Sequence, residues 1–248
     1  MSHLILLSGW GIDARIWQTL ESHWPAGIEV SAPDWPGYGG KPALEDPGDI
    51  GELARAMAGD LPAEAVWVGW SLGGLLATAL LDHLPHPRAL VTIGMGPRFC
   101  TEGGISRREL AAFQRVFARD PEAVRLHFLR WQLQGEPAPL IAQRQLLDLL
   151  GPTPSADIAT LAAGLDQLAE LDNGNHLAAP PCPFWRLAGE RDRLLSPALR
   201  RSADYRLRDA GHCPMLSRPD ALAWRLAEIV RHAVERDDDT ATIERCSP

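Results

Sequence analysis

Ser71 occupies the centre of the pentapeptide Gly-Trp-Ser-Leu-Gly at residues 69–73, a G-x-S-x-G pattern. A short β-branched and aromatic run, 66–68, precedes it, and a leucine-rich helical pattern, 75–84, follows it. A serine held at such a strand-to-helix turn projects from the end of a sheet, and the flanking glycines let the backbone bend sharply. This context makes Ser71 a candidate nucleophile.

A serine hydroxyl attacks a carbonyl only when a base takes its proton and an acid orients that base. In this architecture the chain order is serine, acid, histidine. Asp192 follows an expected strand at 184–187, and His212 follows a second expected strand. We expect Asp192 to be the acid and His212 the base, with Glu190 and Asp172 as alternative acids. The seven other histidines precede the serine or lie in helical patterns or the insertion, which favours surface or packing roles.

Ester chemistry also needs donors for the oxyanion. The backbone N–H of Leu72, directly after the serine, is one candidate, and the loop after the first strand supplies the other at Trp10. Gly9 and Gly11 flank Trp10 and allow a close backbone approach. The Trp10 ring either forms a wall of the acyl pocket or simply packs in the core.

These residues require a sheet whose strands end side by side. Short apolar runs predict six strands, at 4–8, 28–32, 66–69, 90–93, 184–187 and 204–207. Helical patterns alternate with them, including one that begins at Asp49 and one that begins at Ser217 and ends near Glu235. Alternating strands and helices are typical of parallel βαβ units in a doubly wound α/β sheet, whose carboxyl strand ends carry the chemistry.

The alternation stops between residues 100 and 171, where the sequence shows helical patterns and no strand. Three patterns are recognisable; they begin at Ser106, at Asp120-Pro121 and at Thr153-Pro154. We expect this insertion to form a helical cap (lid) over a core built from residues 1–99 and 172–236. The polar, aperiodic segment 237–248 predicts a disordered tail.

Composition limits the class of protein. The formal charge of −8 argues against a general nucleic-acid binder. No long apolar segment suggests a signal peptide or a membrane span. The four cysteines have no zinc-like spacing, so we expect no metal site. Free thiols favour a reducing cytoplasm, and we expect a monomer there.

Together these motifs resemble the α/β-hydrolase superfamily and, within it, the pimeloyl-[acyl-carrier protein] methyl ester esterases of biotin synthesis. The likeness spans nearly the whole chain and is most specific at the loop 9–11 and at 67–74, which includes a tryptophan before the serine. Looser likeness covers 128–132, 164–168 and 183–187. The chain departs from the family at Ser8, where a histidine is usual, and it lacks the leading hairpin common in the superfamily.

The resemblance implies a cofactor-free serine carboxylesterase that cleaves a methyl ester at the end of an acyl chain on a carrier protein. Substrate would contact Trp10, Ser71, Leu72 and His212. It also implies a substrate channel lined by a cap segment, which comprises Phe128, Leu129, Arg130, Trp131 and Gln132.

Carrier protein is acidic, and residues 106–146 hold seven arginines against four acids. Arg108, Arg115 and Arg119 recur at helical spacing, so these and Arg130 are candidates for carrier docking; the alternative is a solvated helix face.

Other functions stay open at this point. The same triad would serve a general short-chain esterase, a thioesterase, or a lyase like the menaquinone-pathway member of the superfamily. A non-catalytic binding protein of this fold would be expected to have a broken triad, whereas all three positions are filled here.

Overall fold

The computed structural model describes residues 2–151 and 156–245, with side chains to Glu235. Its centre is a six-stranded sheet in which every neighbouring pair is parallel, in the order β2-β1-β3-β4-β5-β6. The strands are β1 Ser2–Leu7, β2 Ile28–Ser31, β3 Val66–Trp70, β4 Ala89–Ile93, β5 Phe184–Gly189 and β6 Tyr205–Leu207. The prediction of six parallel strands in a doubly wound α/β fold is therefore confirmed.

Alternate strand residues enter two separate apolar clusters, one on each face of the sheet. Leu4 and Leu6 pack on one face, whereas Ile5 and Leu7 pack on the other. Because both faces of the sheet are buried, consecutive residues of these strands are apolar. The helices of the core are η1 Ala14–His23 (a 3₁₀ helix), α1 Ile50–Met57, α2 Leu72–Ala79, η2 Leu80–Asp82, α7 Gly174–Ala178, α8 Pro197–Ser202, α9 Pro214–Ser217 and α10 Pro219–Arg245.

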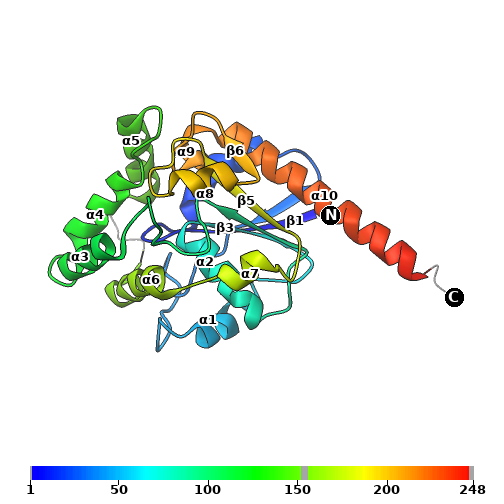
Figure 1. The fold of residues 1–248 in the computed structure, drawn as a ribbon, viewed down its shortest axis with the longest axis horizontal. Coiled ribbons are helices and arrows are strands. Elements are labelled where there is room, and N and C mark those ends of the chain that lie inside the picture. Colours follow the sequence, from blue (N-terminus) through cyan, green and yellow to red (C-terminus); the bar gives the residue numbers. More distant parts are fainter. Residues whose placement is uncertain (1, 152–155, 246–248) are drawn as a thin grey trace.

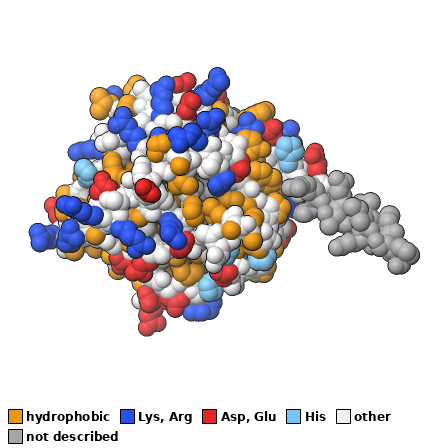
Figure 2. Space-filling view, viewed as in Figure 1, with side chains coloured by type: hydrophobic (Ala, Val, Ile, Leu, Met, Phe, Trp, Pro, Cys, Tyr) orange, Lys and Arg blue, Asp and Glu red, His pale blue; other side chains and the backbone are white. Residues whose placement is uncertain are grey.

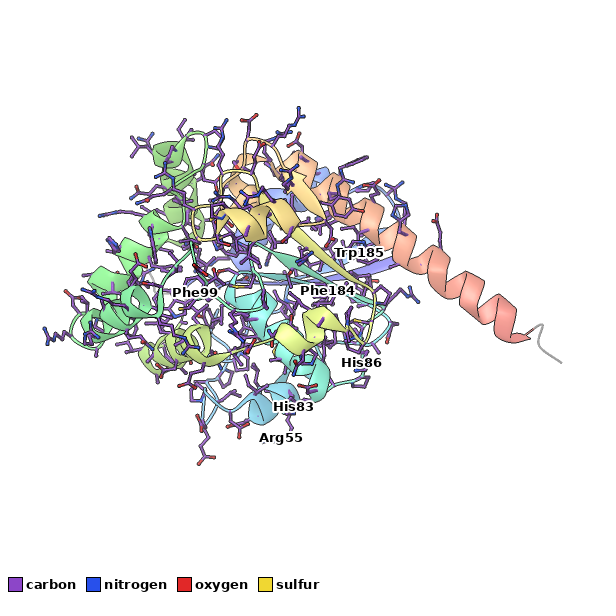
Figure 3. All side chains as sticks on the ribbon, in the orientation of Figure 1. Arg55, His83, His86, Phe99, Phe184 and Trp185 are labelled. Atoms are coloured by element: carbon purple, nitrogen blue, oxygen red, sulfur yellow. The ribbon has the colours of Figure 1, made fainter. Side chains whose placement is uncertain are left out.

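The register brings the carboxyl ends of the central strands to one level. Leu7 lies opposite Gly69, and Gly69 lies opposite Thr92. The loops that follow β1, β3, β5 and β6 therefore open at the same edge of the sheet. In Figure 3, Phe99, just after β4, lies on the side of the cap helices, whereas Phe184 and Trp185 at the start of β5 lie away from them.

All helices between β4 and β5, except the short α7, belong to the predicted cap. They are α3 Arg107–Phe117, α4 Pro121–Trp131, α5 Pro139–Leu150 and α6 Ile158–Glu170. They gather at one side of the molecule, opposite the far end of α10 (Figure 1). Ser106 and Glu109 form a reciprocal capping box on α3, and Asp120 caps α4, so both helices begin where the sequence predicts.

The cap differs from the sequence prediction in its second half. Helix α5 was not expected, because Pro137 and Pro139 resemble helix breakers and Ala138 gives no capping side chain; Pro139 instead takes the first helical position. The last cap helix begins at Ile158 with Asp157 as its N-cap. Thr153 and Pro154, where this helix was predicted to start, lie outside the described residues.

Two chain segments connect the cap to the core, and they are bonded to each other. The Asn173 backbone N–H donates to the Pro97 carbonyl at 2.8 Å, and the Arg98 guanidinium pairs with the Asp172 carboxylate at 2.5 Å. The Asn173 side chain also donates to the Leu75 carbonyl of α2 at 3.0 Å. The two ends of the cap thus meet at one place on the core, next to the helix that follows Ser71.

The C-terminal prediction needs correction. Helix α10 continues to Arg245, so residues 237–245 are helical rather than a disordered tail; no glycine or proline after Pro219 interrupts the helix. Residues 246–248 lie outside the described part of the chain. Ser217 does not cap this helix, because it ends α9 and α10 starts at Pro219.

The described residues include neither a membrane-spanning helix nor a group of metal-ligating side chains. None of their helices has the length and apolarity needed to cross a membrane. None of their His, Cys, Asp and Glu side chains form a group that could hold a metal ion.

Candidate active site

Ser71 stands at a strained turn between β3 and α2. Its φ of 55° is positive, a backbone conformation that residues other than glycine rarely adopt. Such strain is typical of functional sites. The strain falls on the serine itself, whereas the glycines are required by space. A Cβ on Gly73 would lie 2.5 Å from the Ser8 carbonyl oxygen, and one on Gly69 would lie 2.5 Å from the Gly73 carbonyl oxygen.

The structure brings Ser71, His212 and Asp192 together. The distance from His212 Nε2 to Ser71 Oγ is 3.0 Å, and that from His212 Nδ1 to Asp192 Oδ2 is 2.8 Å. His212 and Asp192 have no exposed surface, and Ser71 has 1%. The other Asp192 oxygen accepts from the Leu194 N–H at 2.9 Å, which fixes the carboxylate. This is the chain of contacts that nucleophile, base and acid require.

The alternative acids do not reach this histidine. Glu190 is exposed on the loop after β5. Asp172 pairs with Arg98 between the two connections of the cap. Asp192 is the carboxylate that contacts the imidazole, and its role as the acid stays a prediction.

Trp70 supports the histidine from the strand side. Its indole Nε1 donates to the His212 carbonyl at 2.7 Å, and the two ring centroids lie 5.6 Å apart. Trp17 packs edge-on against Trp70, with ring centroids 6.4 Å apart. The tryptophan before the serine, which the sequence marked only as a likeness, thus fixes the loop that carries His212.

The loop after β1 passes directly beside Ser71, because a Cβ on Gly9 would lie 2.9 Å from Ser71 Cβ. The Tyr38 hydroxyl accepts from the Gly11 N–H at 3.2 Å. Burial raises the pKa of Tyr38, so its hydroxyl stays neutral. Leu72 begins α2, where backbone N–H groups point out of the helix and favour negative charge. The oxyanion roles of Trp10 and Leu72 stay predictions that this arrangement favours.

Ser8 fills the position where the resembling family has histidine. Its carbonyl accepts from the Trp35 indole at 2.9 Å, and its hydroxyl accepts from the Trp17 indole at 3.1 Å. Both indoles are buried, so two tryptophans hold the start of this loop.

The Trp10 ring joins the core to the cap. Its Nε1 donates to the Leu161 carbonyl of α6 at 2.8 Å. Phe113, Phe117 and Phe128 pack edge-on around it, with ring centroids 6.0, 5.8 and 4.9 Å away. The sequence left a pocket wall or simple packing open, and the ring makes an extensive packing contact with the cap.

The predicted channel segment divides between faces of α4. Phe128 and Trp131 join the aromatic cluster on Trp10, with their own centroids 5.9 Å apart. Leu129 packs in the cluster on the opposite face of the sheet, and Arg130 is exposed. Gln132 is buried. A helix cannot direct five consecutive side chains to one side.

The described part of the molecule contains a small apolar cavity of about 30 Å³ beside Leu72. It lies between α2 and α6 and is lined by Trp35, Tyr38, Leu76 and Gly164 among others. A larger surface groove of about 980 Å³ lies between η1 and β2 and includes none of the three residues of the hydrogen-bonded chain.

Glu136 was not recognised in the sequence beyond its charge. It lies between α4 and α5, has 4% exposure, and accepts from the backbone N–H groups of Gly211 and Cys213. A local pattern could not have revealed this contact, since 75 residues separate Glu136 from Gly211.

The predicted docking arginines Arg108, Arg115 and Arg119 are exposed. Arg108 and Arg115 lie on α3, whereas Arg119 follows its end. Figure 2 shows Lys and Arg side chains over the part of the surface where Figure 1 places the cap.

This fold and this hydrogen-bonded serine define the class of protein. A model of the alpha/beta hydrolase family matches residues 4–225, and the chain belongs to that family. Its fold is similar to that of an esterase from Exiguobacterium antarcticum, with a TM-score of 0.76 and 18% identity over 93% of this chain and 92% of the other. A thermophilic esterase from Thermogutta terrifontis gives a TM-score of 0.74 at 20% identity, over 94% and 90%.

Curated relatives narrow the likeness. The pimeloyl-[acyl-carrier protein] methyl ester esterase of Vibrio vulnificus (strain YJ016) is 31% identical over 235 residues, 90% of this chain and 92% of the relative. The esterase of the same name from Aromatoleum aromaticum is 34% identical over 246 residues, 92% of this chain and 98% of the relative.

Proposed function

We propose that this chain is a serine carboxylesterase that hydrolyses the methyl ester of a pimeloyl group carried on acyl carrier protein. The names of the curated relatives support this substrate, and the fold neighbours support carboxylic ester hydrolysis. The observation that carries the proposal is the buried chain from Ser71 Oγ through His212 to Asp192, with distances of 3.0 and 2.8 Å.

In the proposed mechanism, His212 Nε2 takes the hydroxyl proton as Ser71 Oγ attacks the ester carbonyl. Asp192 accepts from Nδ1–H and stabilises the imidazolium. The backbone N–H groups of Leu72 and Trp10 donate to the oxyanion. Collapse of the tetrahedral intermediate breaks the bond to the methoxy group, which leaves as methanol with the proton from Nε2. Water, deprotonated by the same nitrogen, then releases the acid from Ser71.

The cap supports an acyl substrate rather than a polar one. The aromatic cluster of Trp10, Phe113 and Phe128 lies over the loop beside Ser71. Since Ser71 is almost completely buried, an acyl chain reaches it only when the side chains around it move. Pocket walls of this kind bind methylene groups by excluding water.

The carrier would dock on the exposed arginines of the cap. Arg108 and Arg115 lie on α3 with Arg119 just beyond it, and an acidic partner would be attracted to this basic region. The overall charge of −8 makes this local basic region more notable, since it opposes the sign of the molecule as a whole.

Replacement of Ser71 by alanine tests the proposal. We expect kcat on the carrier-linked methyl ester to fall by about 10³–10⁶-fold, while Ser202→Ala on α8 serves as a control with normal activity. Near-normal turnover by Ser71→Ala would refute the mechanism.

The substrate is tested separately. A panel of p-nitrophenyl esters and thioesters, assayed beside the carrier-linked ester, separates a dedicated esterase from a general one. Failure of the wild-type gene to restore growth without biotin in a strain lacking this esterase would refute the substrate.

A further inference from the structure

Glu136 of the cap contacts the loop that carries His212 on both sides of the histidine. Its Oε2 accepts from the Gly211 N–H at 2.9 Å, and its Oε1 accepts from the Cys213 N–H at 2.7 Å. The carboxylate therefore accepts hydrogen bonds from the backbone N–H groups on both sides of His212. Gly211 makes this approach possible, because a Cβ there would lie 2.6 Å from Oε1.

The residue before Glu136 touches the loop of the acid. A Cβ on Gly135 would lie 2.2 Å from the carbonyl oxygen of Arg191, the neighbour of Asp192. Gly135 also has a φ of 109°, a conformation that glycine adopts without strain. One short cap segment thus packs against both loops that bring the base and the acid to Ser71.

Burial of a carboxylate is costly unless hydrogen bonds satisfy it. Glu136 has 4% exposure, and its two oxygens satisfy two backbone donors that would otherwise be buried in the same place. Charge-assisted hydrogen bonds are shorter and stronger than neutral ones, so this contact resists displacement of the loop.

We infer that Glu136 is a positioning residue that holds His212 in line with Ser71, so that the base is fully aligned only when this part of the cap is seated on the core. The inference rests on the proposed function, since it assigns a task to a support of the same triad. Hydrogen bonds between the cap and the loop of the base would make the core competent when the lid is closed.

Glu136→Gln tests the inference with little change in shape. The amide keeps one acceptor oxygen and turns an N–H donor toward a backbone N–H. We expect kcat for a short p-nitrophenyl ester to fall by about 10–100-fold, with KM changed by less than about threefold, because misalignment of a base by a fraction of an ångström acts on the chemical step. The low-field proton resonance of the His212 imidazole should broaden or shift.

Asp120→Ala is the matched control. Asp120 also accepts from a backbone N–H in the cap, that of Ala123 at 3.0 Å, but it caps α4 and has no contact with the His212 loop. Its loss should lower the thermal midpoint as Glu136→Gln does and leave kcat unchanged. If both variants lost kcat in proportion to their loss of stability, Glu136 would be a structural residue only and the inference would be wrong. An unchanged kcat in Glu136→Gln would also overturn it.

Two further measurements keep the outcomes distinct. If Glu136→Gln does not fold, Gly211→Ala pushes the carboxylate away from the other side and should give the same loss of kcat; normal kcat in that variant would contradict the inference. Labelling by a fluorophosphonate, located by mass spectrometry, distinguishes failure of the proposed function from failure of the inference about Glu136. Absence of label on Ser71 of the wild type removes the proposed function and the inference with it, whereas equal labelling rates in wild type and Glu136→Gln remove the inference alone.

Discussion

The strand-end loops of the core and the helices of the cap meet at Ser71, yet different kinds of information in the sequence determine them. In the core, a parallel sheet converts chain position into spatial position, because each loop must begin where its strand ends. Ser71, Asp192 and His212 are far apart in sequence and still meet within 3.0 Å. In the cap, neighbouring helices are placed by the shapes of their side chains. The arrangement of the core can therefore be predicted from sequence motifs, whereas the arrangement of the cap depends on side-chain packing.

The largest expected effect breaks the core side of this contrast. Asp192→Asn keeps the shape of the acid and removes its charge, so the imidazole loses its orientation and its stabilised positive form. We expect kcat to fall by about 10⁴-fold, measured on any accepted ester. Glu190→Gln on the same loop should stay within about threefold of the wild type. Comparable losses in both would mean that the loop, rather than the contact at 2.8 Å, is what matters.

A pair of glycine substitutions compares the rigidity of the two regions. A Cβ on Gly73 meets two backbone oxygens, of Ser8 and Leu7, at 2.5 and 2.6 Å, and neither strand end can give way. Gly73→Ala should cost about 3 kcal/mol or more of unfolding free energy. A Cβ on Gly164 of α6 meets side-chain atoms of Trp10 and Leu72 at 2.7 and 3.1 Å.

The Gly164 neighbours can move, so Gly164→Ala should cost about 1–2 kcal/mol, partly offset by the better helix propensity of alanine. Its main effect should be kinetic, about a tenfold loss of kcat, since it displaces the two residues expected at the oxyanion. Urea unfolding and ester kinetics on both variants measure the contrast. Equal losses of stability would show that the cap is as rigid as the core.

Charge reversal sharpens the contrast from the cap side. Arg115→Glu combined with Arg119→Glu should raise KM for the carrier-linked ester about tenfold at low salt, because an acidic partner loses its attraction. The effect should shrink at high ionic strength. Turnover of a small p-nitrophenyl ester should not change. Arg55→Glu on α1, outside the cap (Figure 3), is the control; an equal rise of KM there would mean that only net charge counts.

The smallest expected effect concerns the place where the regions join. Hydrogen bonding from the Arg98 side chain lowers the pKa of Asp172. A carboxyl group with a lowered folded pKa stabilises the protein above its unfolded pKa and loses this contribution as the pH falls through the folded value. Asp172→Asn should therefore lower the thermal midpoint at pH 7 by about 1–2 °C, as expected for an exposed pair. Below the folded pKa of Asp172 the two proteins should unfold together; a constant difference across the pH range would exclude the ion pair as its cause.

The limits of sequence-based prediction follow the same division. The six strands could be predicted, as could the contact of Ser71, His212 and Asp192, because apolar runs, a G-x-S-x-G turn and chain order are visible in the sequence. Helix α5 could not be predicted, since Pro137 and Pro139 are residues that usually interrupt a helix. Glu136 could not, since its partners are remote and its residue type is common on surfaces. The channel segment was assigned as a block, whereas the helical period sends Phe128 and Leu129 to different clusters.

The bonded connections of the cap have a consequence for how such chains diversify. The insertion leaves the core near Pro97 and returns at Asn173, where 2.8 Å separates the two bonded backbone atoms. A segment that starts and finishes at one point can be exchanged as a single cassette without altering any strand crossover. A transplanted cassette would still have to present an acceptor to Gly211 and Cys213. Substrate choice can thus change by recombination of one contiguous stretch of gene, provided that this small contact with the histidine loop is inherited with it.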